Sequence, residues 1–479
     1  MPKVYIAAAF RSASARDPRE TDKVYGTVVD SNYINFLESV EDVFLRFGYD
    51  TCLPHRDEGM WGRAYFNPAD ISAVCFRHIE TSDVIFGIAE GGRGVHIEFG
   101  YAARAGKRLI LAYRAGKEPS TLIWGFPRDL SPWHLGFGGE TDTVIFEYKD
   151  QADLIAKLEE KLTDRGERSI SRVWKRTISG IIDIGSHTLK LRVFRHGKGT
   201  LPGILYEAKE SIGIISSVTS TGRIDESSIT CMTGVLRRFL GICTEHNCDR
   251  VIAVGTAALR KAANSAEVLD TIKNELGLRV QLLTPDIELD YVYGAVRRTI
   301  QAKEPIAVLN LGGGSTQIGV GTNDFIQHRF LLPIGTRHIT EKWPWKDGFN
   351  RDAYEEMRKF ANHAVIKIID KPIPGCRFIV HTGGELDFLL HCRVPLELCR
   401  ESPKHVSQIS VSDFENFSIQ FMRMKASEVA SRYRLDPGWV SGAVASNIIA
   451  ISVAVATGAS ILVPSNLNIT DGIILNDAR

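Results

Sequence analysis

Residues 308–320 read VLNLGGGSTQIGV, and residues 181–191 read IIDIGSHTLKL. Each stretch is an apolar run, a short turn that contains Gly and Ser, and a second apolar run. This order predicts two β-strands joined by a tight turn. Glycine lets the backbone approach an anion closely, and successive N–H groups then form an anion-binding concavity. Two such hairpins, one from each half of a domain, can clamp one phosphorylated ligand between them.

Length and composition narrow the class of protein. The chain has 479 residues, which is too long for a single ordinary core and predicts about two to four domains. Its 44% hydrophobic and 24% charged residues are typical of a soluble globular protein. The net charge of +1 supplies no overall field for nucleic acid or an anionic membrane. We therefore expect no membrane or nucleic-acid partner, and an anionic ligand must be bound locally.

Cysteine usage and the N-terminus predict a cytoplasmic protein. The eight cysteines show no pairing pattern, which is typical of reduced, mostly buried thiols. Cys243, His246 and Cys248 form a loose group without zinc-finger spacing. The N-terminus lacks the charged-then-apolar pattern of a signal peptide. The apolar stretch 448–463 is rich in Ala, Ser and Gly, which predicts a buried helix followed by a strand rather than a membrane span.

Strands and helices alternate in the first third of the chain. Apolar runs at 4–8, 84–89 and 109–113 predict strands, and helical spacing of apolar residues at 33–47 predicts a helix that Gly48 ends. This alternation is typical of an α/β domain with a parallel sheet of the Rossmann-like, flavodoxin-like type. Ligands bind such sheets at the carboxyl ends of the strands. We assign residues 1–148 to this domain.

A charged segment separates the two parts of the chain. Residues 149–176 predict an amphipathic helix over 154–162 followed by a basic stretch, and we interpret the whole segment as a helical linker. Beyond it we expect two subdomains, 177–302 and 303–479. Each begins with one of the glycine-rich hairpins, which suggests an ancient duplication.

Residues 178–479 resemble the exopolyphosphatase and guanosine pentaphosphate phosphatase family (Ppx/GppA), which has the two-subdomain actin–Hsp70–sugar kinase fold. The matching motifs occur in the family's order over roughly three hundred residues. They are DIGSHTLKL, VGTAALRKAAN at 254–264, TPDIELDYVYGAV at 284–296, LGGGSTQI, LPIGTRHIT at 332–340, HTGGE at 381–385 and NITDGII near the end. The helical C-terminal extension of some members is missing.

The resemblance implies a role for each matching residue. Arg260 would pair with a phosphate oxygen, for which a guanidinium fork is suited. Glu288, in the first turn of its helix, would be the general base that orients the attacking water. Asp183 would help to hold Mg²⁺ through water. The phosphates would be held by N–H and hydroxyl groups of Gly185, Ser186, Gly313, Gly314, Ser315 and Thr316. Taken singly, these residues are also common in tight turns, on surfaces and at helix starts.

This chain departs from the family at the second hairpin. The family usually reads DIGGGSTE, with two carboxylates where this chain has the amides of Asn310 and Gln317. Hard divalent cations prefer anionic oxygen, so we expect weakened Mg²⁺ binding. The same change removes repulsion toward a polyphosphate. His187 and Asp290 also stand where the family usually has Asn and Arg. The hypothesis is reduced phosphohydrolase activity with ligand binding retained.

Residues 3–148 resemble the nucleoside deoxyribosyltransferase superfamily, including its N-glycosidase branch. The motifs are KVYIAAAFR at the start, TSDVIFGIA at 81–89 and GVHIEFGYAARAGKRLIL at 94–111. By resemblance, Glu98 would attack the anomeric carbon of a sugar, because a carboxylate suits an oxocarbenium-like transition state. Tyr5 would line the sugar pocket, and Arg11 would bind a 5′-phosphate. Alternatively, Glu98 is an acid in the first turn of its helix that the dipole stabilises, and Arg11 lies in a solvated loop.

Two positions in this domain differ from that superfamily. Cys75 stands where an Asp is usual, and it falls on an apolar stripe, so we expect it to pack as a small hydrophobe. Asp70, over one turn away, is a candidate substitute for the missing carboxylate. His96 replaces a common glycine and would either donate a proton or narrow the pocket.

The leading interpretation is a two-part nucleotide enzyme or signalling protein. One module binds polyphosphate, pppGpp or a related phosphorylated nucleotide, and the other cleaves or binds a nucleoside-type glycosidic bond. By analogy, this architecture suits stress signalling or phage defence. One alternative is a genuine phosphohydrolase with a non-catalytic nucleotide-binding N-terminal domain, and another is a sensor in which both sites are degenerate. A homo-oligomer with Trp124, Trp133 and Phe137 in its contact is a further expectation.

Overall fold

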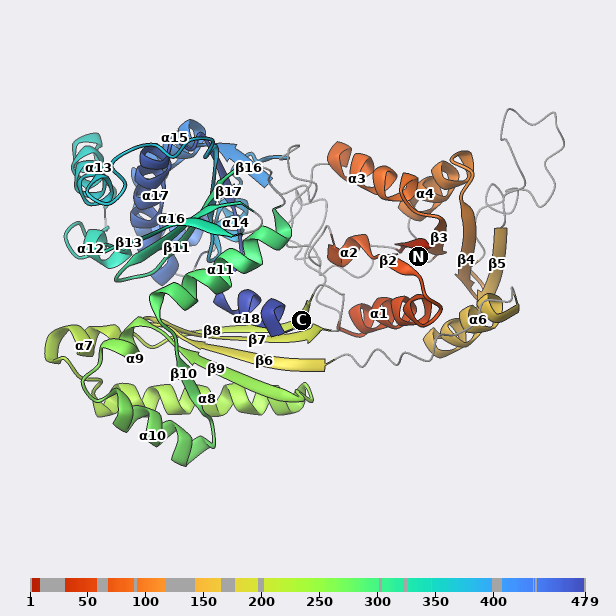
Figure 1. The fold of residues 1–479 in the computed structure, drawn as a ribbon, viewed down its shortest axis with the longest axis horizontal. Helices are drawn as coiled ribbons and strands as arrows, with labels where there is room; N and C mark the ends of the chain where they lie inside the picture. The colour runs from red at the N-terminus through yellow and green to blue at the C-terminus, as the bar shows by residue number, and fades with distance from the viewer. Residues whose placement is uncertain are drawn as a thin grey trace. The chain divides into compact units, whose positions relative to one another are not determined.

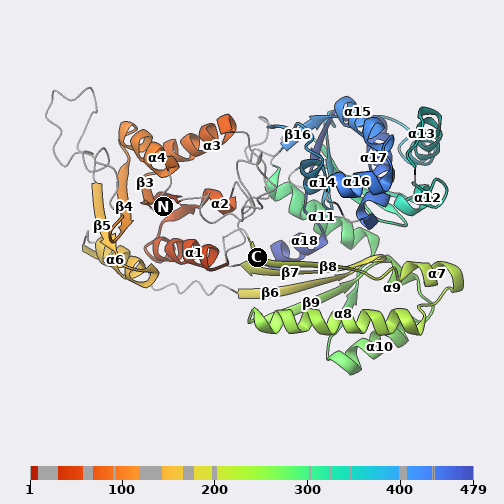
Figure 2. The same cartoon turned by 180° about the vertical axis from the view of Figure 1, so that it is seen from behind.

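The computed structural model divides into two compact units, Met1–Lys175 and Arg176–Arg479, drawn from opposite sides in Figures 1 and 2. The structure describes residues 2–8, 31–57, 68–89, 93–117, 143–164, 177–196, 202–300, 304–322, 325–345, 347–398, 407–433, 435 and 437–477. The predicted roles of Arg11, Trp124, Trp133 and Phe137 lie outside these residues, as does the side chain of Asp70.

The first unit is an α/β domain with a parallel sheet, which confirms the predicted fold class. The sheet has the order β2-β1-β3-β4-β5, and all four pairings are parallel. Its strands are β1 (Lys3–Ala7), β2 (Asp50–Cys52), β3 (Val84–Ile88), β4 (Arg108–Arg114) and β5 (Thr143–Tyr148). Apolar runs in β1, β3 and β4 are almost wholly buried, as expected for strands covered on both faces.

Helices cover both faces of this sheet (Figure 1). They are α1 (Ser31–Arg46), α2 (Pro54–Asp57), α3 (Pro68–Glu80), α4 (Arg93–Arg104) and α6 (Gln151–Asp164). α3 packs with α4, and α1 packs with α6. α6 buries Leu154, Leu158 and Leu162, so this helix belongs to the first unit rather than to a linker. The expectation of a linker helix was wrong because its apolar face has a partner in α1 and β5.

The second unit contains two sheets with one repeated topology. The first sheet has the order β10-β9-β6-β7-β8. Its strands are β6 (Thr177–Ile184), β7 (Thr188–His196), β8 (Gly203–Ser211), β9 (Arg250–Gly255) and β10 (Val280–Leu282). β6, β7 and β8 form an antiparallel meander, and β9 and β10 add in parallel. The helices of this half are α7 (Ile215–Thr221), α8 (Glu226–Glu245), α9 (Ala257–Lys261), α10 (Ser265–Leu276) and α11 (Pro285–Thr299).

The second sheet begins in the same way and has the order β13-β12-β11-β14-β17-β16-β15. β11 (Ile306–Leu311), β12 (Thr316–Gly321) and β13 (Ile326–Leu332) form the meander, and β14 (Phe378–His381) and β17 (Ile461–Pro464) add in parallel. β15 (Glu397–Leu398) and β16 (Ser407–Ser410) complete the edge. The helices are α12 (Thr336–Thr340), α13 (Arg351–Ile366), α14 (Glu385–His391), α15 (Val411–Met422), α16 (Ala426–Tyr433), α17 (Pro437–Thr457) and α18 (Ile469–Asp477).

The apolar stretch near the C-terminus forms α17 followed by β17, as predicted. α12, α13, α15 and α16 pack around α17, so its apolar surface is covered by protein on several sides. In the part of the chain that the structure describes, no helix is both long and apolar enough to cross a membrane.

α11 and α18 cross at a distance that only glycine permits. A Cβ atom on Gly472 would lie 2.0 Å from the carbonyl oxygen of Tyr291. α11 begins as predicted, because the Thr284 side chain accepts a hydrogen bond from the N–H of Ile287 and Pro285 follows the cap. This fixed start places Glu288 in the first turn of α11, which confirms that part of the prediction.

A buried ion pair joins α1 to α2 in the first unit and yields a stability prediction. Arg56 donates two hydrogen bonds to Glu41, at 2.7 and 2.8 Å, and the Glu41 side chain is fully buried. Asp57 also pairs with Arg56, at 2.8 Å, so Glu41→Gln leaves the buried guanidinium with one carboxylate partner instead of two. We expect this loss to destabilise the unit by about 2 kcal/mol. Urea unfolding, followed by hydrogen exchange of peptides from residues 31–57, measures this change.

Glu159→Gln is the matched control. Glu159 pairs with Arg46 between α6 and α1, but both side chains are more than one-third exposed. We expect it to cost less than about 1 kcal/mol. Equal urea midpoints for the two variants would contradict the importance of the buried pair.

Candidate functional site

The first glycine-rich hairpin joins β6 to β7. The N–H of Gly185 donates to the carbonyl oxygen of Thr188 at 3.1 Å, and a Cβ on Gly185 would lie 2.7 Å from that oxygen. Glycine is therefore required for so tight a turn. The antiparallel register then places Lys190 directly opposite Asp183.

The second hairpin joins β11 to β12. The N–H of Gly312 donates to the carbonyl oxygen of Ser315 at 3.0 Å. Among the described residues, none accepts a hydrogen bond from the N–H groups of Gly313 and Gly314. These two donors are at the tip of the hairpin and suit an anion. The Thr316 hydroxyl instead donates to the carbonyl oxygen of Ile334 at 2.8 Å and is fully buried, so in this arrangement it supports the hairpin.

α12 packs directly on the second hairpin. The N–H groups of Thr336 and Arg337 donate to the carbonyl oxygens of Gly312 and Gly313, at 3.1 and 3.0 Å. A Cβ on Gly335 would lie 2.3 Å from the carbonyl oxygen of Gly312. These contacts engage the carbonyl oxygens of Gly312 and Gly313 and do not use the N–H groups of Gly313 and Gly314.

The two hairpins meet each other. The imidazole of His187, in the first hairpin, lies so close to Gly313 that a Cβ there would be 3.0 Å from the ring Cδ2 and 3.1 Å from Nε2. Close by, Arg337 donates to the Thr219 hydroxyl on α7 at 3.2 Å. Burial and the charge of Arg337 lower the pKa of His187. A residue from each half of the second unit therefore contacts the other half at this point.

Arg260 and Glu288 form an ion pair beside the first hairpin. Nη1 of Arg260 donates to Oε1 of Glu288 at 2.7 Å and also to the carbonyl oxygen of Leu283. Glu288 is only 5% exposed, and its burial raises its pKa. The nearby Asp183 is also buried, which raises its pKa too, and its Oδ1 has no hydrogen-bond partner among the described residues. The structure thus brings together three of the predicted site residues.

The two amides of the second hairpin bond to each other. Nδ2 of Asn310 donates to Oε1 of Gln317 at 2.8 Å, across the register pair that joins β11 to β12. Two carboxylates at these positions would repel each other unless a cation lay between them. The amide pair satisfies itself, so this part of the site needs no cation.

The residues present fit only a weak magnesium site. No group of three or more His, Cys, Asp or Glu side chains suited to a metal occurs within the described ranges. The unpartnered Oδ1 of Asp183 suits a water-bound Mg²⁺, since this ion keeps several of its waters. The other nearby carboxylate, Glu288, is held by Arg260.

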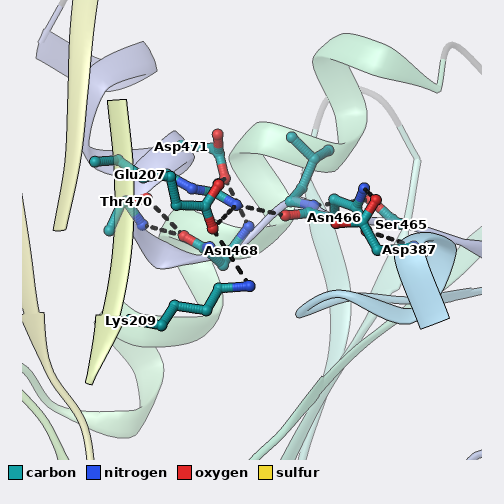
Figure 3. A network of polar contacts seen from close by, with 10 residues as sticks. Glu207, Lys209, Asp387, Ser465, Asn466, Asn468, Thr470 and Asp471 are labelled. Atoms are coloured by element: carbon teal, nitrogen blue, oxygen red, sulfur yellow. Dashed lines mark hydrogen bonds and ion pairs between the residues drawn. The ribbon is translucent and has the colours of Figure 1, made fainter. Parts of the chain in front are cut away.

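A second polar network joins the two halves of the second unit (Figure 3). Arg192 on β7 pairs with Asp471 on α18, with Glu207 on β8 at 3.3 Å and with the carbonyl oxygen of Asn466 at 3.2 Å. The amide of Asn466 in turn donates to Asp387 on α14 at 2.7 Å. Strands of the first half are therefore tied to the end of β17 and to α14.

In the first unit, Tyr5, Cys75 and Glu98 meet beside the parallel sheet. The Tyr5 hydroxyl donates to Oε1 of Glu98 at 2.8 Å, and the Cys75 thiol hydrogen-bonds to the same carboxylate. Burial raises the pKa of Glu98 to about 7, although both hydrogen bonds act in the opposite direction. Tyr5 is 1% exposed, and its pKa is also raised by burial.

One expectation for this group was wrong. α4 begins at Arg93, so Glu98 lies in its second turn and gains little from the helix dipole. Cys75 packs against the apolar core of this unit, as expected for a small hydrophobe, and its thiol is in addition a polar partner of Glu98. The apolar stripe did not indicate this second contact, which depends on the packing of α3 against α4. His96 is half-buried on α4, two residues before Glu98.

Comparison with known proteins identifies the family to which the second unit is similar. The model of the Ppx/GppA phosphatase family matches residues 192–476, which is more than half of the chain. Exopolyphosphatase 1 of Mycobacterium leprae is 28% identical over 165 residues, which are 34% of this chain and 49% of that protein. Exopolyphosphatase 2 of Mycobacterium tuberculosis is 24% identical over 309 residues, 62% of this chain and 97% of that protein. The chain thus spans about half the length of the first relative.

Solved structures show the same fold. The Ppx/GppA family member of Aquifex aeolicus has a TM-score of 0.54 at 25% identity and covers 63% of this chain and 98% of its own. An exopolyphosphatase from Cytophaga hutchinsonii has a TM-score of 0.54 at 19% identity, with coverage of 63% and 98%. These neighbours have the actin–Hsp70–sugar kinase fold, which confirms the predicted architecture of the second unit. The chain therefore belongs to the Ppx/GppA phosphatase family.

Proposed function

We propose that the second unit binds an oligophosphate between its two hairpins and hydrolyses it slowly. The ligand is polyphosphate or the phosphate chain of a nucleotide such as pppGpp. The observation that carries this proposal is the contact between the hairpins at His187 and Gly313, next to the free N–H groups of Gly313 and Gly314. We assign Gly185, Ser186 and Ser315 to the same cradle, because they form the turns that face the ligand.

Arg260 and Glu288 supply the chemistry. When a phosphate binds, its oxygen replaces Glu288 as the partner of Arg260, since a guanidinium prefers such an anionic fork. This exchange frees the Glu288 carboxylate, whose pKa burial has already raised. A freed carboxylate takes a proton from the attacking water as its oxygen bonds to the terminal phosphorus. The bond from that phosphorus to the bridging oxygen breaks, and the shortened chain leaves.

Asp183 is the residue that would hold Mg²⁺ through water. The ion would neutralise charge on the phosphate oxygens when bound. Because Asn310 and Gln317 offer neutral oxygens and are already paired, they add little to its binding. The proposed hydrolysis is therefore slow, while binding of the anion is retained.

The double variant Asn310→Asp with Gln317→Glu tests the proposed cause of slow turnover. Two carboxylates in place of the amide pair attract a divalent cation, so we expect Mg²⁺-dependent phosphate release from polyphosphate to rise roughly tenfold. Malachite-green assays on polyphosphate and pppGpp, with and without Mg²⁺, measure this release. Glu288→Gln in the same background should abolish it.

Two results would contradict this account. Robust turnover by the natural chain would refute slow hydrolysis. An unchanged rate in the double variant, with the fold intact by circular dichroism, would show that the amides do not limit the reaction.

We infer a second activity for the first unit, cleavage of a nucleoside-type glycosidic bond. It is favoured by a single observation, the Glu98 carboxylate held by Tyr5 beside the parallel sheet. An ionised Glu98 would attack the anomeric carbon as the bond from that carbon to the base nitrogen breaks. The base leaves with a proton, for which His96 is the candidate donor. Arg11 remains the candidate ligand of a 5′-phosphate.

Product analysis tests this second activity. We expect the natural chain to release free base from a panel of deoxynucleotides and Glu98→Gln to release none, because an amide cannot form the glycosyl ester. Chromatography with mass spectrometry detects the base. Glu147→Gln, at an exposed position on β5, is the control and should behave like the natural chain. Tight nucleotide binding without any product would favour a sensor instead.

The raised pKa of Glu98 also predicts how stability depends on pH. The folded unit binds this proton more tightly than the unfolded chain does, because the pKa moves from 4.5 to about 7. Its contribution to stability is therefore complete below pH 4.5 and is lost as the pH rises through 7. We expect the natural chain to lose more stability between pH 5 and pH 8 than Glu98→Gln, as thermal unfolding would show. Identical pH profiles would contradict the raised pKa of Glu98.

A further inference from the structure

Cys75 belongs to the group around Glu98, but the proposed glycosidic cleavage assigns it no role. Its thiol hydrogen-bonds to the Glu98 carboxylate and to the Tyr5 hydroxyl. The side chain is half-buried and packs against the apolar core of the first unit. Cys75 therefore touches both the core and the carboxylate that would attack the sugar.

Three elements fix these side chains relative to one another. Tyr5 is on β1, Cys75 is on α3 and Glu98 is on α4. α4 lies so close to the sheet that a Cβ on Gly87 of β3 would be 2.1 Å from Cε2 of Phe99, the residue after Glu98. α3 packs on α4 in turn. Glu98 therefore receives hydrogen bonds from two separate elements, the sheet and α3.

The chemistry of the two donors decides their effect on Glu98. A tyrosine hydroxyl and a cysteine thiol are neutral donors. A second carboxylate in place of Cys75 would add a like charge and disfavour the ionisation of Glu98, whereas a thiol can bond to the ionised form without adding charge. Burial raises the pKa of Glu98 to about 7, and the hydrogen bonds from Tyr5 and Cys75 act against that rise.

Other charged groups on the elements packed against α4 have a different role. β3 carries no titratable side chain. On α3, the Glu80 carboxylate accepts a hydrogen bond from the Tyr101 hydroxyl. Among the described side chains, Tyr5 and Cys75 are the two whose hydrogen bonds change the pKa of Glu98. The remaining described groups of α3, α4 and β4 are Arg77, His78, His96, Arg104, Arg108, Tyr113 and Arg114.

We propose that Cys75 is a positioning residue, whose thiol holds the Glu98 carboxylate in its ionised form and in the orientation that Tyr5 also supports. The inference rests on the proposed glycosidic cleavage, in which the ionised carboxylate attacks the sugar. Glu98 is the catalytic residue of that reaction, and Cys75 acts through it. The first unit thereby uses a thiol at a position where the superfamily that it resembles usually has an Asp.

Titration of Glu98 in the full chain tests this proposal without any substrate. Carbon-13 NMR of protein labelled at the glutamate carboxyl carbon gives the signal of Glu98, which is identified as the one that Glu98→Gln removes. We expect Cys75→Ala to lower the ionisation constant of Glu98 roughly fivefold, as the loss of one hydrogen bond predicts. Cys75→Ser, which keeps a donor of similar size, should have an ionisation constant close to that of the natural chain.

Cys52→Ala is the packing control. Cys52 belongs to the same apolar core and does not donate to Glu98, so its removal should leave the titration unchanged. If Cys75 only fills space, Cys75→Ala and Cys75→Ser shift the titration equally, and the proposal is wrong. An unchanged titration in Cys75→Ala would also overturn it.

A pH profile of base release connects the titration to the reaction. We expect Cys75→Ala to reach half of its maximal rate at a higher pH than the natural chain, because fewer Glu98 side chains are ionised near neutral pH. Cys75→Ser should restore the natural profile. Absence of free base from the natural chain would overturn the proposed cleavage, whereas the titration of Glu98 would still decide the role of Cys75.

Discussion

The close contact of two glycine-rich hairpins is the constraint on which the second unit depends. Gly335 can lie against Gly312 only because it has no side chain, and a side chain on Gly313 would crowd the ring of His187. The contact with Gly335 and α12 uses carbonyls of the second hairpin, and the N–H groups of Gly313 and Gly314 have no acceptor among the described residues. Gly313 and Gly314 are half-buried, so their N–H groups are available to an anion. The same geometry supports the packing of the second unit and suits the oligophosphate ligand that we propose.

Around this contact, each arginine is held by a partner that a phosphate oxygen can replace. Arg260 is held by Glu288, and Arg337 is held by Glu341 and Thr219. The Asn310–Gln317 pair is different, because it is neutral and satisfied by its own hydrogen bond. A site of this kind binds an anion readily and recruits a divalent cation poorly. This balance is the basis of the slow hydrolysis that we propose for a member of this family.

Much of the fold could be predicted from the sequence. Apolar runs bounded by glycine give the strands of both units, and the cap at Thr284 and Pro285 fixes α11 and hence Glu288. The register of a tight hairpin also places Lys190 opposite Asp183, a pairing that the sequence analysis did not predict. Such features are local, so neighbouring residues determine them.

Contacts between distant segments could not be predicted in this way. Cys75 meets Glu98 because α3 packs on α4, and α6 joins the first unit because α1 offers it an apolar face. The hydrogen bond from Arg337 to Thr219 joins residues 118 positions apart. Periodicity gives the face of a helix but not the partner of that face. The buried hydroxyl of Thr316 shows the same limit, since a residue in a phosphate-type motif can serve the hairpin instead.

The most direct measurement is the response of the hairpin N–H groups to an oligophosphate. Glycine-selective ¹⁵N labelling, with assignment by substitution, gives the amide signals of Gly185, Gly313 and Gly314. On addition of tripolyphosphate, the signals of Gly313 and Gly314 should shift strongly, and that of Gly185, whose N–H already has an acceptor within its turn, should shift less. Binding heat without any shift of Gly313 and Gly314 would place the ligand elsewhere and contradict the account.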